Sequence, residues 1–198
     1  MPSFSSMRLT ARILELGFAY LRSDALPELV APYLGRISDE LHESSSASVL
    51  EGLDIVYVAR VSTSRIMSVA LGVGARLPAV TTSMGRVLLA ALPAQDRDER
   101  LAKAELVAYT RHTVTSRAEL RGILKTVAAK GYCIVDQELE EGLRSIAVPV
   151  VDRDQRVRAA INVSAQANRV SLDTVRRSFL PSLQRAAVDI QAVLRRQV

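Results

Sequence analysis

The chain is poor in cysteine, histidine and aromatic residues, and these shortages narrow its possible functions. Its 198 residues include two histidines, no tryptophan and one cysteine, Cys133, and aromatic residues make up 4%. An internal disulfide is therefore impossible, and the usual cysteine and histidine zinc site lacks ligands. So few aromatics also argue against a stacking surface for single-stranded nucleic acid. We expect neither a metal nor a cofactor.

Long apolar runs are missing as well. No run approaches the ~20 residues that a membrane-spanning helix needs, and the first residues, MPSFSSMRLT, lack the apolar segment of a secretory signal. We expect no membrane association and a cytoplasmic location.

Positive charge is carried mostly by arginine. The net charge is +5, and lysine occurs only at Lys103, Lys125 and Lys130. Arginine recognises anions through its planar guanidinium, but a GC-rich genome explains the same composition. The charge alone does not indicate a nucleic-acid-binding protein.

Hydrophobic periodicity predicts an α+β fold, with helices packed on one antiparallel sheet. Helical spacing predicts helices over 10–21, 29–41, 84–92, 96–108, 117–130 and from 172 onward. Alternation and β-branched residues predict strands over 48–53, 55–61, 66–71, 132–135, 143–151 and 156–164. Ser116 with Glu119 forms a capping box, and Gly131 supplies a helix stop. No long linker divides the chain after residue 26.

The last two predicted strands form a hairpin that gathers small polar side chains on one face. If the turn is centred on Arg153 and Asp154, Ser145 lies opposite Asn162, and Leu143 lies opposite Ser164. The other face carries apolar residues and is predicted to be core: Ile146, Val148, Ile161 and Val163. A polar cluster in a buried place needs hydrogen-bond partners, which a small polar ligand could supply. Solvent, or bonds within the cluster, would satisfy it equally well.

A second polar segment, Thr81-Thr82-Ser83-Met84-Gly85-Arg86, stands at a predicted helix start. Free backbone N–H groups and the helix dipole favour a carboxylate or phosphate there, and Gly85 would let a ligand approach closely. A simple helix cap explains the same residues. The segment is not a P-loop, since it lacks the Gly-rich loop and the Gly-Lys-Ser/Thr ending.

Nucleophilic catalysis has little support in the sequence. Ser83 lacks the glycine pattern of a nucleophile elbow. His42 falls at an exposed helix end and His112 in a polar loop. Cys133 is predicted to be a small core residue, and the acidic residues at 136–141 are predicted to be a solvated loop. We expect that the chain is not an enzyme.

Four segments in order resemble the effector-binding domain of IclR-type transcriptional regulators. They are LTARILELGFAYL (9–21), Leu77-Pro78 followed by TTSMGRVLLA (81–90), GYCIVDQELEEGLRSIAVPV (131–150) and AAINVSA (159–165). The amino-acid sequences of the second and third segments resemble the branch of the family that regulates aromatic-acid catabolism through β-ketoadipate. The resemblance implies a curved antiparallel sheet flanked by helices, similar to GAF and profilin folds. It also implies a sensor for an aromatic carboxylate such as protocatechuate or p-hydroxybenzoate.

The resemblance implies which residues contact the effector. Polar contacts fall on Ser83, Met84, Ser145, Asn162 and Ser164, with Gly85 beside them. The apolar lining falls on Ile66, Val69, Leu77, Val135 and Leu143. Relatives carry Asp at the position of Val135, and Cys and Ser at those of Ser145 and Asn162. These departures favour a less polar, aromatic ligand over small keto acids. Arg144 is a doubtful carboxylate partner, because alternation points it away from Ser145.

The resemblance also implies an organisation and partners. Residues 1–25 match the end of a wing and a linker helix, and residues 26–198 match the effector-binding domain. DNA would be bound only through an N-terminal winged helix-turn-helix that this sequence does not contain. Family members form homodimers or homotetramers, and we expect the same. The alternatives are a stand-alone GAF-like sensor and, less favoured, a small enzyme acting on an organic acid.

Overall fold

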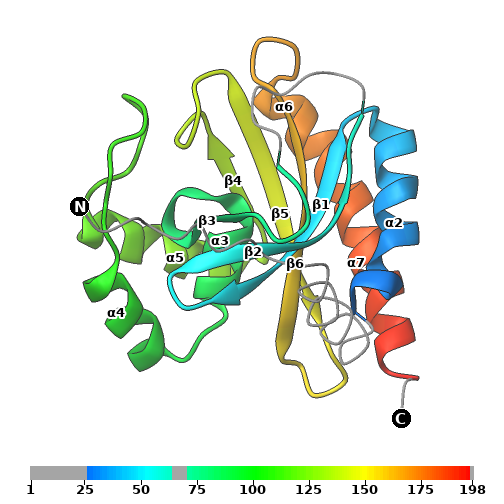
Figure 1. The fold of residues 1–198 in the computed structure, drawn as a ribbon, viewed down its shortest axis with the longest axis horizontal. Helices are drawn as coiled ribbons and strands as arrows, with labels where there is room; N and C mark the ends of the chain where they lie inside the picture. Colours follow the sequence, from blue (N-terminus) through cyan, green and yellow to red (C-terminus); the bar gives the residue numbers. More distant parts are fainter. Residues whose placement is uncertain (1–25, 64–70, 197–198) are drawn as a thin grey trace, which may run out of the picture.

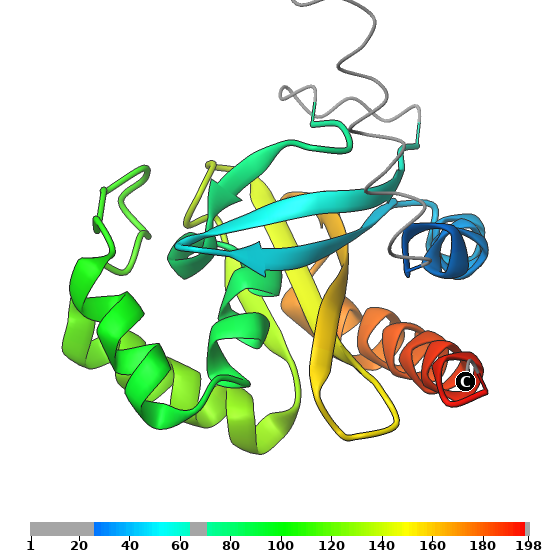
Figure 2. The same ribbon diagram turned by 60° about the horizontal axis from the view of Figure 1, so that its bottom comes forward.

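The computed structural model describes residues 26–63 and 71–196. There, a curled antiparallel sheet of six strands lies between two layers of helices, which confirms the α+β prediction (Figures 1 and 2). The strands are β1 (Ser44–Glu51), β2 (Asp54–Val61), β3 (Arg76–Pro78), β4 (Cys133–Asp136), β5 (Leu143–Val151) and β6 (Val157–Gln166). The helices are α2 (Leu26–Leu41), α3 (Ser83–Ala90), α4 (Ala94–Lys103), α5 (Arg117–Lys130), α6 (Leu172–Thr174) and α7 (Leu180–Leu194). The predicted helix over 10–21 and the proposed boundary at residue 25 lie outside the described residues.

The strand order is β3-β2-β1-β6-β5-β4. β1 and β2 form the predicted hairpin, which turns at Gly52 with a φ of 63°. The third strand differs from the prediction. Residues 66–70 are not described, and β3 is a three-residue strand that pairs with β2. Its shortness and terminal Pro78 hid it from a search for alternating runs.

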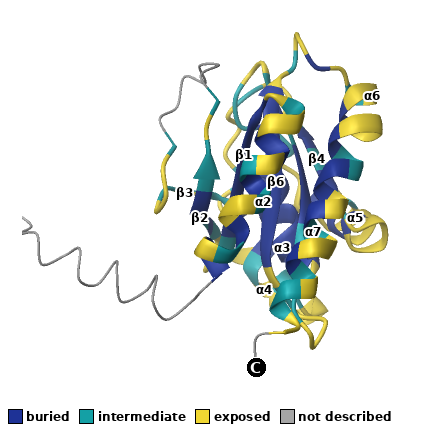
Figure 3. Ribbon diagram, turned by 90° about the vertical axis from the view of Figure 1, so that its right-hand side faces the viewer, coloured by how far each residue is buried: buried dark blue, intermediate teal, exposed yellow. Residues whose placement is uncertain are grey.

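One helical layer, α2 and α7, covers one face of the sheet (Figure 3). Its stripe of apolar residues is completely buried, as Val30 and Leu34 illustrate. The hairpin residues predicted to be core all face this layer: Ile146, Val148, Ile161 and Val163. Three serines begin β1 shortly after α2, and the hydroxyl of Ser45 donates to the Leu34 carbonyl oxygen at 2.8 Å.

The other layer consists of α3, α4 and α5, and α3 packs directly on β5 and β6. The predicted cap and stop of α5 are confirmed. The Ser116 hydroxyl accepts the Glu119 N–H at 3.4 Å, and Gly131 ends the helix with a φ of 73°. α4 ends at Lys103, earlier than predicted.

The register of the β5–β6 hairpin corrects the prediction. Val151 pairs with Val157 instead of Arg156, and a bulge next to Val150 adds one more residue of shift. Ser145 therefore lies opposite Ser164, not Asn162, and Leu143 lies opposite Gln166. Because the total shift beyond the bulge is two residues, the paired side chains of 143–150 and 159–166 keep their predicted faces.

Candidate functional site

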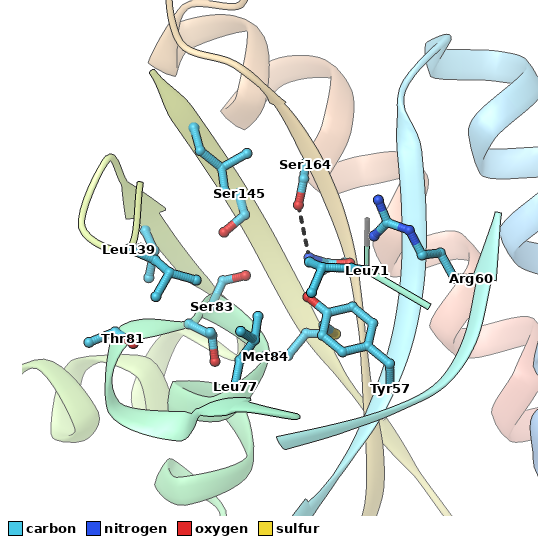
Figure 4. A pocket seen from close by; sticks show the side chains of 14 residues that line it. Tyr57, Arg60, Leu71, Leu77, Thr81, Ser83, Met84, Leu139, Ser145 and Ser164 are labelled. Carbon is cyan, nitrogen blue, oxygen red and sulfur yellow. Dashed lines mark hydrogen bonds between the residues drawn. The ribbon is translucent and has the colours of Figure 1, made fainter. Parts of the chain in front are cut away.

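A pocket lies between the sheet and the start of α3 (Figure 4). About 460 Å³ of space, which includes open solvent at the mouth, lies between the lining side chains. The lining residues are Tyr57, Arg60, Leu71, Leu77, Thr81, Thr82, Ser83, Met84, Val135, Leu139, Leu143, Ser145, Asn162 and Ser164. The two polar segments singled out in the sequence thus meet across one pocket.

The floor of the pocket is a polar row on β5 and β6. Ser145 and Ser164 are cross-strand partners, and the Asn162 side-chain amide donates to the Ser164 hydroxyl at 3.1 Å. The carbonyl oxygen of the Asn162 amide is buried without a hydrogen-bond partner among the described residues. A buried acceptor of this kind is costly unless something bonds to it.

The start of α3 forms the facing wall. Thr82 caps the helix, and its hydroxyl accepts the Gly85 N–H at 3.1 Å. Ser83 is 1% exposed, and its hydroxyl also has no hydrogen-bond partner within the described part of the chain. Met84 lies below it, where its sulfur accepts the Ser48 hydroxyl at 3.2 Å. Two residues that line the pocket, Ser83 and Asn162, therefore each carry a buried polar atom without a partner in the described part of the chain.

Gly85 does not have the predicted role. It is not among the lining residues, and the position where a side chain would begin lies 2.2 Å from the Ala79 carbonyl oxygen. The glycine therefore allows the 3-10 turn Ala79–Thr81 to pack against α3, and ligand access is not its function.

Tyr57 and Arg60 line the pocket from β2, and the sequence analysis missed both. Strict alternation places residues 57 and 60 on opposite faces. A bulge intervenes, because Ala47 pairs with Ala59 while Ser48 pairs with Tyr57. The extra residue, Val58, turns to the α2 and α7 layer, so Tyr57 and Arg60 share the pocket face. Burial raises the pKa of the Tyr57 phenol, and the nearby Arg60 charge opposes this shift.

A buried ion pair holds the loop that supplies Leu139. Arg86 of α3 donates through both terminal nitrogens to the Glu138 carboxylate, each at 2.6 Å, and its Nε donates to the Val80 carbonyl at 2.7 Å. The Val114 N–H donates to the same carboxylate at 3.1 Å. The prediction that Glu138 is solvated is therefore wrong, since it is 8% exposed.

The other predicted site residues divide into two groups. Eight lie in the pocket: Ser83, Met84, Ser145, Asn162, Ser164, Leu77, Val135 and Leu143. Ile66 and Val69 lie outside the described residues. Arg144 points to the other face, as expected, where it forms an ion pair with Asp136 at 2.9 Å.

The described residues that line the pocket include no histidine, cysteine, aspartate or glutamate. His42 and His112 are exposed and do not line it. Cys133 is buried, and burial raises the pKa of its thiol to about 12. Within residues 26–63 and 71–196, no cluster of three or more metal-ligating side chains occurs. In the same ranges, no helix is long and apolar enough to cross a membrane.

A partly apolar pocket with a few hydrogen-bonding groups is typical of a small-molecule binding site. Residues 18–192 match the family model "Bacterial transcriptional regulator IclR C-terminal". The chain belongs to this family, and it is a regulator domain, not an enzyme.

Similar proteins support the assignment. The chain is 48% identical over 183 residues to the Pca regulon regulatory protein of Pseudomonas putida, covering 92% of the chain and 63% of that relative. The chain therefore spans less than two thirds of this relative's length. A putative transcriptional regulator from Rhodococcus sp. RHA1 has a TM-score of 0.89 at 49% identity, covering 94% of this chain and 76% of that one. An IclR homolog from Microbacterium hydrocarbonoxydans, solved with 4-hydroxybenzoate, has a TM-score of 0.82 at 28% identity, covering 94% and 75%.

Proposed function

We propose that the chain senses an aromatic carboxylate, such as protocatechuate or p-hydroxybenzoate, in the pocket between the sheet and α3. The observation that carries the proposal is the pair of buried polar atoms of Ser83 and Asn162, which lack partners within the described residues. A ligand hydroxyl can donate to the Asn162 oxygen, and a ligand hydroxyl or carboxylate oxygen can accept from the Ser83 hydroxyl. The apolar lining, including Leu77 and Leu143, suits an aromatic ring.

One similar protein supports the same class of ligand. The Microbacterium homolog was solved with 4-hydroxybenzoate, which is an aromatic acid. We propose that Met84, Ser145 and Ser164 also contact the effector, with Val135 beside them.

Sensing also requires an output. We propose that the effector favours one arrangement of a homodimer or homotetramer over another, because a ligand shifts only an equilibrium between states that it binds unequally. DNA contact would come through a winged helix-turn-helix in the longer protein. Residues 1–25 would then be the linker and residues 26–198 the sensor.

Calorimetric titration of the 198-residue chain with p-hydroxybenzoate and protocatechuate tests this function. We expect a 1:1 complex with either acid, and weaker binding of a short keto acid such as pyruvate. Asn162→Ala should weaken binding about tenfold, as the loss of one buried hydrogen bond does.

The matched control is Asn168→Ala, because Asn168 is exposed in the turn after β6 and does not line the pocket. It should leave the affinity unchanged. Equal affinities for wild type, Asn162→Ala and Ser83→Ala would contradict the proposed site.

A further inference from the structure

Arg60 is the only positively charged side chain among the described residues that line the pocket. It lies in one row across the sheet, since Arg60 of β2 pairs with Ser46 of β1 and Ser46 pairs with Asn162 of β6. Directly paired side chains share a face. The guanidinium is therefore on the same surface as the unsatisfied Asn162 oxygen.

The guanidinium of Arg60 is positioned but has no ionic partner in the described part of the chain. One terminal nitrogen donates to the Ser46 hydroxyl at 3.1 Å, and Nε donates to the Ser62 hydroxyl at 3.1 Å. The Arg60 side chain forms no ion pair with any described carboxylate. Its second terminal nitrogen forms no hydrogen bond within the same residues, although a guanidinium offers donors on all three nitrogens.

Within residues 26–63 and 71–196, the other cationic candidates near the pocket are already neutralised or face elsewhere. Arg86 is buried against Glu138, and Arg144 pairs with Asp136 on the opposite face of the sheet. The dipole of α3 carries only about half a charge, and the Thr82 hydroxyl already takes the Gly85 N–H of its first turn. A carboxylate entering a mostly apolar pocket needs a full opposite charge to offset its desolvation.

We infer that Arg60 binds the carboxylate of the effector and so sets the preference of the pocket for anionic ligands. This inference rests on the proposed function and adds an orientation. The carboxylate lies toward Arg60, at the β2 end, and the other end of the ligand points toward Ser83, as the opposite positions of these residues in Figure 4 allow. This orientation differs from the anion position that the sequence suggested at the helix start, where a simple cap was the alternative.

The test compares p-hydroxybenzoate with p-hydroxybenzamide, which has nearly the same shape and no charge. The wild-type chain should bind the acid about 10- to 100-fold more tightly than the amide, the range for hydrogen bonds to a charged group. Arg60→Gln should remove this preference, because it weakens binding of the acid and leaves binding of the amide unchanged. Arg60→Lys should keep part of the preference because the positive charge remains.

Two controls separate charge recognition from a change in folding. Arg153→Gln makes the same charge change in the exposed β5–β6 turn and should keep the preference. Ser46→Ala keeps the Arg60 charge but removes a hydrogen bond that positions it, so the preference should fall by less than in Arg60→Gln. Melting temperatures show whether each variant is folded.

The outcomes distinguish the two proposals. An unchanged acid-to-amide ratio in folded Arg60→Gln would overturn the role of Arg60 and leave the aromatic sensor intact. If the wild-type chain bound neither p-hydroxybenzoate nor p-hydroxybenzamide, the proposed function would be overturned, and the role of Arg60 with it.

Discussion

Gly85 lies inside α3, and packing against the preceding turn requires a residue without a side chain at this position. Its Cα faces the backbone of Ala79, so an added Cβ would lie 2.2 Å from the carbonyl oxygen and 2.3 Å from the Cα of that residue. Backbone atoms cannot move aside as the end of a flexible side chain can. The glycine therefore fixes how closely the turn before α3 approaches the helix that carries Ser83.

Gly85→Ala should destabilise the protein despite the better helix propensity of alanine. Overpacking costs about 1–3 kcal/mol, which exceeds the gain of about 1 kcal/mol from replacing a helical glycine. The matched control is Gly122→Ala in α5, where nothing lies within 4 Å of the added Cβ, and this change should stabilise the protein. Urea unfolding of both variants measures the difference. A stabilising effect at both positions would show that Ala79 moves aside at little cost.

At the scale of elements, alternation predicted the side of the hairpin residues correctly and their partners incorrectly. Ser145, Asn162 and Ser164 share a face because the shifts at the turn and at Val150 total two residues. In β2 a single bulge has no such compensation, so strict alternation would separate Tyr57 from Arg60, although both line the pocket. β2 contains no glycine that would mark its bulge in the sequence. This is why the polar floor on β5 and β6 could be predicted from the sequence, while the position of Arg60 in the pocket could not.

The Arg86–Glu138 pair was also hidden, because 52 residues separate its members. In sequence, Glu138 belongs to an acidic run that is typical of a solvated loop. In the structure, the pair connects α3 to the loop between β4 and β5, which carries Leu139 of the pocket. Long-range pairing of this kind depends on the tertiary fold and cannot be derived from local spacing.

Glu138→Gln should destabilise the protein by about 3–5 kcal/mol, because it leaves the buried Arg86 charge without a counter-charge. The double variant Arg86→Met, Glu138→Leu should recover most of this loss, since it removes both charges. Denaturant unfolding measures both effects.

An exposed ion pair provides the control for this series. Arg177 and Asp173 form an i,i+4 pair with side chains 81% and 66% exposed. Asp173→Asn should change stability by no more than about 0.5 kcal/mol. If Glu138→Gln were equally mild, the buried pair would not be what holds the loop against α3.

At the scale of the whole molecule, the two helical layers have different tasks. The α2 and α7 layer closes one face of the sheet with an apolar core. On the other face, α3 packs on β5 and β6. The pocket lies between the N-terminal end of α3 and the sheet, and both the helix end and the sheet contribute polar groups to it. The same sheet thus carries an apolar core on one face and the candidate pocket on the other.

The most direct test is a crystal structure of the 198-residue chain grown with p-hydroxybenzoate at saturating concentration. The account predicts electron density for one aromatic acid between the start of α3 and the β5–β6 floor. One polar end should lie within hydrogen-bond distance of Ser83, and the carboxylate should lie against Arg60. Density for the acid at another surface, with none in this pocket, would contradict the account.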